Sequence, residues 1–293
     1  MRYYASKCHD RLNGRPFDIE KDYPFLCLNP KYKATLSAPC EYILDSGAFQ
    51  DVTGDRLTYA QALDRQLGFE RKLGQEAHAI VSYDRLVDEQ KSETGSQFKA
   101  RVDTDTGDEY VEDTIKAAEY LVSQRNRLGE RHLILSCQGT TVPQYLGCLD
   151  NILDLSTLTG GGSKDIIGIG GFCILSRSKV YEEQFDEIMK VAIPRIAERG
   201  LKRIHIFGMG VFRVLIRTQM MAKRYGIELS YDTSSAEVNA TMGRLFSPVD
   251  GQLKQVWDKE EKYAEYHPCD IARMNIRLID GFWKEVNQLR RLR

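Results

Sequence analysis

Three aspartates stand directly after short apolar runs of the 293-residue chain. Asp45, Asp84 and Asp232 end the segments YILD, AIVSYD and IELSYD. Such runs, bounded by polar residues or glycine, are typical of buried strands. In a parallel barrel, a carboxylate at the C-terminal end of a strand points into a shared site. Two or three carboxylates at one mouth supply a nucleophile and a general acid/base, the pair that breaks glycosidic bonds.

Residues near these strand ends favour a flat, hydrogen-bonding ligand. Phe49, four residues after the first aspartate, offers a surface on which an aromatic base can stack. Gln138 ends another apolar run, and the pair Gly170 and Gly171 ends the next one. The amide, Asp84 and the backbone of the glycine pair can read the edge of a base, since glycine lets a ligand approach the main chain.

The elements that position these residues alternate between strands and helices. Strands are expected at 2–6, 25–28, 42–44, 79–83, 132–137, 165–171, 203–207 and 227–231. Three helices are expected at 58–73, about 109–128 and about 179–199. A further helix is expected to begin at residue 143, and another, after the strand at 203–207, to end at residue 225. Connections of this length predict parallel strands with right-handed crossovers, and eight such units close an α/β, (β/α)₈ TIM barrel. The competing doubly wound sheet lacks a G-x-G-x-x-G sequence after the first strand.

We expect a single domain over residues 1–293, with a barrel core at about 1–245 and a helical C-terminal segment at 246–293. Residues 88–109 are interpreted as a long polar loop at a strand end, where a lid or substrate-contacting loop would lie. Its acidic cluster at 103–108 lacks the bidentate Glu that a calcium loop needs, so a solvated loop is favoured.

Charge and composition narrow the possible partners and the compartment. Lys and Arg number 41 against 42 Asp and Glu, so a nucleic-acid surface would have to be a local patch. Lys99, Arg101 and Arg177 are the candidates for phosphate contact. We expect no membrane partner, because no apolar stretch approaches the roughly 20 residues of a span. The N-terminus lacks the apolar core of a secretory signal, and seven irregularly spaced cysteines are typical of reduced thiols, which predicts a cytoplasmic protein.

Six short motifs in a fixed order carry a family resemblance. They are DSGAFQ at 45–50, SYD at 82–84, CQG at 137–139, GIGGF at 168–172, FGMG at 207–210 and YD at 231–232. This order at barrel spacing resembles the tRNA-guanine transglycosylase superfamily over roughly residues 40–245. The resemblance implies a TIM barrel that exchanges a guanine base through a covalent enzyme–sugar intermediate.

The resemblance also implies residue roles. Asp232 would be the nucleophile, and Asp45 the acid/base that handles the protons of the departing and incoming bases. Asp84 would bind the N1–H and amino group of guanine, while Gln138 and Gly171 would contact the side that carries the exocyclic oxygen.

Further positions would complete the substrate site. Phe49 would stack on the base, and Ser46 and Gln50 would support the first strand end. The remaining substrate-binding positions implied are Gly139, Gly170, Gly208 and Gly210.

Two departures from the superfamily pattern narrow the substrate. Ala48 stands where the family usually has a second Gly. The family's zinc motif, Cys-x-Cys-x-x-Cys with a distant His, is absent, so no metal or other cofactor is expected. Cys8 and His9 with His267 and Cys269 could be a vestigial metal site, although a buried thiol and a surface imidazole are the favoured interpretation.

A short chain without that motif looks more like the DpdA-type DNA-guanine transglycosylases of phages and genomic islands. The expected function is replacement of guanine in DNA by a 7-deazaguanine such as preQ0, with DNA and this base as partners. A homodimer or a helper protein is also plausible. The alternative is exchange in tRNA. Either substrate requires the target guanine to leave its stack.

Two other classes of function stay open. A noncatalytic barrel subunit that positions nucleic acid would need neither Asp45 nor Asp232. A barrel lyase or aldolase would need a metal cluster or a Schiff-base lysine at a strand end, and no lysine is predicted there. His205, inside a strand, is interpreted as a satisfied core histidine.

Overall fold

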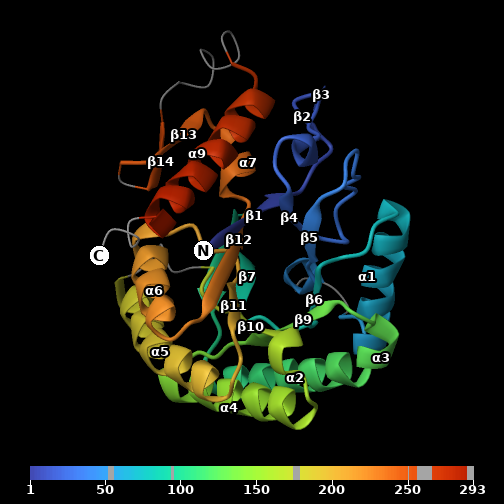
Figure 1. The fold of residues 1–293 in the computed structure, drawn as a ribbon, viewed down its shortest axis with the longest axis vertical. Coiled ribbons are helices and arrows are strands. Elements are labelled where there is room, and N and C mark those ends of the chain that lie inside the picture. Colours follow the sequence, from blue (N-terminus) through green and yellow to red (C-terminus); the bar gives the residue numbers. More distant parts are fainter. Residues whose placement is uncertain (52–55, 94–95, 174–178, 250, 256–265, 289–293) are drawn as a thin grey trace.

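The computed structural model describes the chain except residues 52–55, 94–95, 174–178, 250, 256–265 and 289–293, and except the side chains of residues 89–100 and 163. Eight parallel strands form a closed barrel in the order β1-β12-β11-β10-β9-β6-β5-β4 (Figure 1). The strands are β1 Arg2–Lys7, β4 Phe25–Leu28, β5 Glu41–Leu44, β6 Ala79–Val81, β9 His132–Cys137, β10 Asp165–Ile169, β11 Arg203–Ile206 and β12 Glu228–Thr233. The predicted (β/α)₈ TIM barrel is therefore confirmed.

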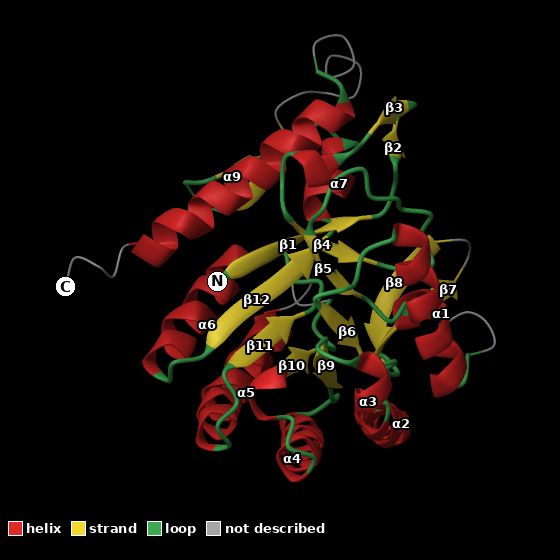
Figure 2. Ribbon diagram, turned by 45° about the vertical axis from the view of Figure 1, so that its right-hand side comes forward, coloured by secondary structure: helices red, strands yellow, loops and turns green. Residues whose placement is uncertain are grey.

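Helices surround most of the barrel (Figure 2). They are α1 Tyr59–Leu73, α2 Thr104–Ser123, α3 Arg125–Leu128, α4 Val142–Leu158, α5 Lys179–Glu198, α6 Phe212–Arg224, α7 Ser235–Ala240 and α9 Pro268–Gln288. Local sequence sets several helix ends. Thr58 and Gln61 form a capping box at the start of α1, and Gly74 ends that helix in the left-handed conformation. Among the described residues, no helix combines the length and the apolar character that crossing a membrane demands.

The hydrophobic core has two main parts. The larger part lies between strands and helices and includes Leu133, Leu135, Ile204 and Ile206. A smaller cluster comprises Tyr4, Cys27, Ile43, Ala79, Val81, Ile134 and Ile166. Because side chains alternate along a strand, the smaller set fills the barrel interior while its neighbours face the helices.

The segment at 88–109 differs from the predicted loop. It forms an antiparallel hairpin, β7 Asp88–Glu93 and β8 Ser96–Arg101, and α2 begins five residues before the expected start. The sequence of β7, DEQKSE, contains no apolar residue, so hydrophobic periodicity gave no signal for the first strand of the hairpin. Asp103, part of the acidic cluster, caps α2 by accepting a hydrogen bond from the backbone N–H of Thr106.

The C-terminal segment is only partly helical. A two-stranded hairpin, β13 Arg244–Ser247 and β14 Gln252–Gln255, precedes α9. The prediction of helix throughout this segment was therefore wrong for the hairpin. Helix α9 packs onto the barrel through Trp283, whose Nε1 donates a hydrogen bond to the Tyr231 hydroxyl at 2.5 Å. Asn275 accepts a hydrogen bond from the backbone N–H of Phe246 and so joins α9 to the hairpin.

Candidate active site

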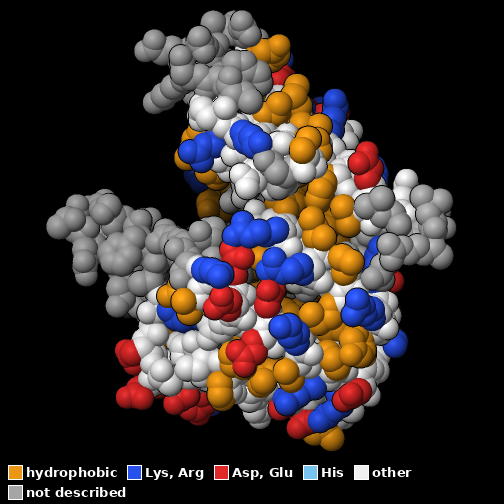
Figure 3. Space-filling view, turned by 90° about the vertical axis from the view of Figure 1, so that its left-hand side faces the viewer, with side chains coloured by type: hydrophobic (Ala, Val, Ile, Leu, Met, Phe, Trp, Pro, Cys, Tyr) orange, Lys and Arg blue, Asp and Glu red, His pale blue; other side chains and the backbone are white. Residues whose placement is uncertain are grey.

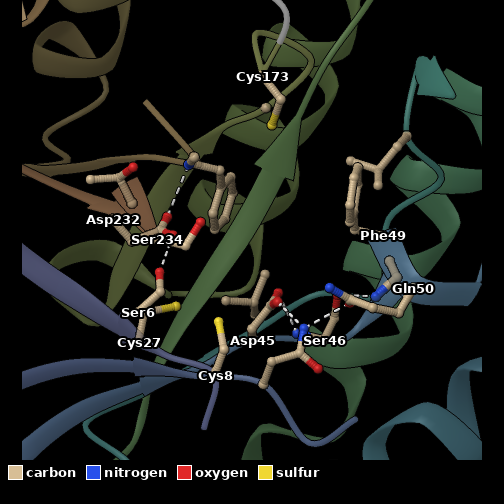
Figure 4. Close-up of a pocket in the computed structure, with 18 of the residues that line it drawn as sticks. Ser6, Cys8, Cys27, Asp45, Ser46, Phe49, Gln50, Cys173, Asp232 and Ser234 are labelled. Atoms are coloured by element: carbon tan, nitrogen blue, oxygen red, sulfur yellow. Dashed lines mark hydrogen bonds between the residues drawn. The ribbon is translucent and has the colours of Figure 1, made fainter. Parts of the chain in front are cut away.

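A cavity of about 290 Å³ opens at the C-terminal ends of the strands. Its lining includes Asp45, Asp84 and Asp232, so the structure brings the three predicted aspartates together. Figure 4 shows Asp45 and Asp232 facing one space, with the Phe49 ring along another side. Carboxylates gathered at this end of a barrel lie where TIM-barrel active sites are built.

Three hydrogen bonds orient the carboxylate of Asp232. Its Oδ1 accepts from the backbone N–H of Gly208 at 3.1 Å and faces Nε2 of His205 at 3.2 Å. Its Oδ2 accepts from the Ser6 hydroxyl at 3.1 Å. The side chain is 14% exposed, so it is fixed in direction yet accessible from the cavity. A carboxylate held in this way is suited to attack an electrophilic carbon.

His205 was interpreted from the sequence as a core histidine, and the structure adds a contact that sequence reasoning missed. The ring is fully buried, and its Nδ1 lies 3.0 Å from the Ser230 hydroxyl. Strands β11 and β12 pair His205 with Ser230, and Asp232 follows two residues later on the same face. The polar residues at 203 and 205, alternating with isoleucines, are the signal that could have placed His205 inside the barrel.

Asp45 lies in a different environment. Its Oδ2 accepts from Asn29 Nδ2 at 2.7 Å, and its Oδ1 accepts from the backbone N–H of Ser46 at 2.7 Å. Burial raises the pKa of Asp45 to about 6, and repulsion from the Asp232 carboxylate adds to the rise. A carboxyl group with this pKa can give and take a proton near neutral pH. Asn29, which also donates to Gln50 Oε1 at 2.8 Å, was not singled out from the sequence.

Asp84 is buried deeper in the same cavity. Burial raises its pKa to about 7, and the charge of Asp45 contributes second. Among the described residues, no other side chain donates a hydrogen bond to the Asp84 carboxyl group. Asp84 can therefore accept hydrogen bonds from N–H groups of a ligand in the cavity.

The turn after Asp45 brings the stacking surface into the cavity. Phe49 lies on the short 3₁₀ helix η2 Ala48–Asp51. Gly47 has a φ of +75°, and a Cβ there would lie 2.8 Å from an Arg65 nitrogen, so glycine is required. Arg65 in turn donates to Asp51 Oδ2 at 2.8 Å and thereby fixes the helix.

Other predicted positions also line the cavity. Ser46, Phe49, Gln50, Gly170, Gly171 and Gly208 are among the lining residues. Ala48, which replaces the family's second glycine, lines the cavity too and packs against Ala62 and Tyr83.

Gln138 and Gly139 do not line the cavity, contrary to the predicted base-binding role. Gln138 is fully buried; its Oε1 accepts from the Val87 N–H at 3.0 Å and its Nε2 donates to the Thr114 hydroxyl at 2.7 Å. A Cβ at Gly139 would lie 2.6 Å from the backbone nitrogen of Tyr145. The Gln-Gly pair therefore supports the loop after Asp84 and the close packing of α4.

The predicted phosphate contacts are not supported as a group. Arg101 is 7% exposed and donates to the Gly171 carbonyl and to Gln184, so it holds the hairpin against the barrel mouth. Lys99 lies on β8, but its side chain is outside the described part of the chain, as is all of Arg177. Gly210 lines a neighbouring groove instead of the cavity.

A lysine does occupy a strand end, contrary to the sequence interpretation. Lys7 is the last residue of β1 and lines the cavity. Its ammonium group donates to Glu20 Oε2 at 2.9 Å and to the Thr35 carbonyl at 2.7 Å. The amine also lies 3.3 Å from Asp10, so it is held by three polar partners, which does not favour Schiff-base chemistry.

The possible vestigial metal site divides into two pairs with separate contacts. Nδ1 of His9 lies 2.5 Å from Glu237, which also accepts from the backbone N–H of Cys8. Cys269 directs its sulfur at backbone carbonyls of residues 12–16, and His267 lies 3.3 Å from the Asn13 carbonyl. Within the described residues, no three His, Cys, Asp or Glu side chains form a group that could hold a metal ion.

No protein-family model matches the chain, and no curated protein matches its sequence. Among solved structures, a GH128 exo-β-1,3-glucanase from Blastomyces gilchristii is similar with a TM-score of 0.44 and 12% identity, over 87% of this chain and 95% of the glucanase. A fructose-bisphosphate aldolase from Campylobacter jejuni is similar with a TM-score of 0.45 and 12% identity, over 98% of this chain and 90% of the aldolase. Neither likeness bears on activity.

Proposed function

We propose that this chain is a base-exchange glycosyltransferase that replaces guanine in DNA with a 7-deazaguanine through a covalent sugar–Asp232 intermediate. The observation that carries the proposal is a pair of carboxylates in unlike environments at one cavity. Asp232 is oriented by three hydrogen bonds, whereas burial raises the pKa of Asp45 to about 6. One is suited to nucleophilic attack and the other to proton transfer. The order of the strand-end motifs supports the same assignment.

In the first half-reaction, a carboxylate oxygen of Asp232 attacks C1′ of the target nucleotide. The bond from C1′ to N9 of guanine breaks, and its electron pair leaves with the base. The protonated Asp45 gives its proton to the departing guanine and becomes a carboxylate. The sugar is then held on the enzyme as an ester of Asp232.

In the second half-reaction, the incoming 7-deazaguanine occupies the same pocket. The Asp45 carboxylate removes the proton from N9 of this base, and N9 attacks C1′. The ester bond to Asp232 breaks and restores its carboxylate. The cycle consumes no water and leaves both aspartates as they began.

The base would be recognised by Asp84, Phe49 and the backbone at Gly170 and Gly171. Guanine and 7-deazaguanines present two neighbouring N–H donors, N1–H and the 2-amino group, which match the two oxygens of an ionised Asp84. Because burial raises the pKa of Asp84 to about 7, base binding should stabilise its charged form and release a proton.

The choice of DNA rests on the missing zinc motif, and tRNA is the competing outcome. The test incubates the protein with radiolabelled guanine or preQ0 and with duplex DNA, single-stranded DNA or tRNA in separate reactions. We expect label in DNA with the parent and none with Asp232→Asn. Label in tRNA alone would overturn the choice of DNA. The absence of label from every polymer would contradict the exchange reaction itself.

A further inference from the structure

A second hollow adjoins the candidate active site. It has a volume of about 450 Å³ and shares Cys173, Gly208 and Ser235 with the lining of the catalytic cavity. Its other walls come from Phe172, from the start of α6, from α7 and from the β13–β14 hairpin. We call this hollow the side groove.

The side groove is bordered by positive charge. Arg213 and Arg244 line it, and none of its described lining residues is Asp or Glu. Arg213 is held by Glu182 on α5. Arg244 is exposed and donates to Asn239 Oδ1 at 3.1 Å; within the described part of the chain, no carboxylate lies within ion-pair distance of it. Its guanidinium charge is therefore available to an anion.

Three arginines on or directly after the neighbouring helices α5 and α6, unlike Arg244, are paired with acids. Arg217 on α6 pairs with Asp186 at 2.8 Å, and Arg195 and Arg199 pair with acids of α4. Figure 3 shows one face of the molecule, on which Lys and Arg side chains lie among Asp and Glu. An arginine beside the catalytic cavity without an acidic partner is consistent with recognition of an external anion.

The turn between β11 and α6 links the side groove to the chemistry. Gly208 lines both hollows and donates its backbone N–H to Asp232 at 3.1 Å. The groove also passes Gly210, where a Cβ would lie 3.1 Å from the Ser235 hydroxyl. A ligand group in the groove would therefore be the immediate neighbour of a sugar bound to Asp232.

We propose that the side groove binds the phosphodiester backbone next to the nucleotide whose base is exchanged, with Arg244 as the main phosphate contact. The inference rests on the proposed function, since a sugar attached to Asp232 within a polymer continues into a flanking phosphate. Guanidinium groups suit this ligand because their N–H donors match phosphate oxygens.

The test measures binding of a fluorescent 12-nucleotide single-stranded DNA with one central guanine, by anisotropy at several salt concentrations. Arg244→Gln should weaken binding roughly five- to tenfold at low salt and reduce the salt slope by about 0.7, the value for one phosphate contact on a single strand. Arg217→Gln, the matched control outside the groove, should stay within about twofold of the parent. Affinity for free guanine, measured by calorimetry, should be the same in all three proteins.

Oligonucleotides with a single uncharged methylphosphonate then locate the contact. The parent and Arg244→Gln should bind with equal affinity the oligonucleotide whose methylphosphonate lies next to the central guanine. Their affinities should still differ for oligonucleotides that carry the methylphosphonate at a distant position. Equal weakening by both substitutions, or an Arg244 effect that survives every methylphosphonate, would overturn the proposal. Tighter binding of RNA of the same sequence would overturn its assignment to DNA.

The same proteins separate failure of the groove from failure of the proposed function. If the parent protein exchanges bases but Arg244→Gln binds DNA as the parent does, the phosphate-binding role of the side groove is contradicted and the proposed reaction stands. If Arg244 contacts a phosphate but the protein exchanges no base, the proposed reaction is contradicted. The side groove would then still be a site that binds a DNA strand.

Discussion

Two pairs of buried acids, at opposite ends of the barrel, have different partners. At the N-terminal end, buried or half-buried acids are paired with arginine: Asp165 with Arg125 and Glu70 with Arg131. At the C-terminal mouth, Asp45 and Asp84 have no cationic side chain within ion-pair distance among the described residues, and burial raises the pKa of both. The N-terminal end is arranged for stability, while the mouth retains acids whose protonation can change near neutral pH.

The Asp165 pair illustrates the first arrangement. Its carboxylate is fully buried, accepts two hydrogen bonds of 2.9 Å from Arg125 and a third of 2.6 Å from the Ser156 hydroxyl. A Cβ at Gly161 would collide with this carboxylate, so glycine is needed beside the pair. Every oxygen of the acid is thus matched, which is the condition under which a buried ion pair is tolerated.

The largest effect is expected at the mouth, from the proposed nucleophile Asp232. Asp232→Asn keeps the shape of the side chain but removes the charge that would attack C1′ in the proposed reaction. We predict that the rate of base exchange falls at least about 10³-fold while the melting temperature changes little. Radiolabel incorporation and thermal unfolding measure the two quantities. A variant that keeps a tenth of the parent rate would place the nucleophile elsewhere.

The opposite result is expected at the N-terminal end. Asp165→Ala leaves the Arg125 charge without its partner, which should lower the free energy of unfolding by about 3 to 5 kcal/mol. Exchange per folded molecule should stay near the parent value. Asp154→Ala removes the partner of Arg199 in an exposed pair and is the control, with an expected loss below about 1 kcal/mol in urea unfolding. Equal losses in both variants would show that the buried pair adds no stability.

A stabilising substitution is expected at Asp84. Because its pKa is raised when folded, the acid opposes folding once the unfolded chain ionises above about pH 4. Asp84→Asn should therefore raise the free energy of unfolding relative to the parent. This increase should be near zero at pH 4, grow up to about pH 7 and then level off between about 1 and 4 kcal/mol. Urea unfolding across this pH range measures the increase.

Asp51 is the matched control, because its replacement by Asn should change the free energy of unfolding in the opposite direction. Burial opposes its ionisation, but hydrogen bonds from Arg65, Lys31 and Tyr83 outweigh burial and lower the pKa of Asp51. Asp51→Asn should therefore destabilise the protein at neutral pH, and this loss should shrink as the pH falls through the acidic range. If Asp84→Asn and Asp51→Asn shift stability in the same direction at pH 7, the contrast between these two acids does not hold.

A smaller effect is expected from His205, which acts by positioning Asp232. His205→Ala should slow exchange about tenfold, and His205→Gln, whose amide can donate to Asp232, should recover part of the rate. His132, which contacts Arg203 at the N-terminal end, is the control: His132→Gln should leave the rate unchanged. Equal rates for the Ala and Gln variants of His205 would indicate that the ring only fills space.

The sequence sufficed for the barrel and for the meeting of the three aspartates. Each apolar run that ends in Asp becomes a strand end, because parallel strands place their C-termini at one mouth. The β7–β8 and β13–β14 hairpins were among the elements missed. Strand β7 contains no apolar residue, β13 and β14 are only four residues long, and the first hairpin depends on tertiary contacts such as that of Arg101 with Gly171.

Assignments that depend on side-chain direction were less predictable. Gln138 directly follows a strand as Asp45 does, yet its amide faces the loop after Asp84. His205 lies within a strand, and only the register between β11 and β12 reveals its contact with Asp232. Arg244 was not singled out, because the absence of an acidic partner is a property of the folded surface.

The most direct test of the central claim is to identify the covalent adduct. The protein is incubated with single-stranded DNA that contains guanine, denatured, digested with protease and nuclease, and analysed by mass spectrometry. We predict a deoxyribose ester on the peptide that carries Asp232, and its absence from Asp232→Asn. An adduct on Asp45 instead, or no adduct while base exchange proceeds, would contradict the proposed mechanism.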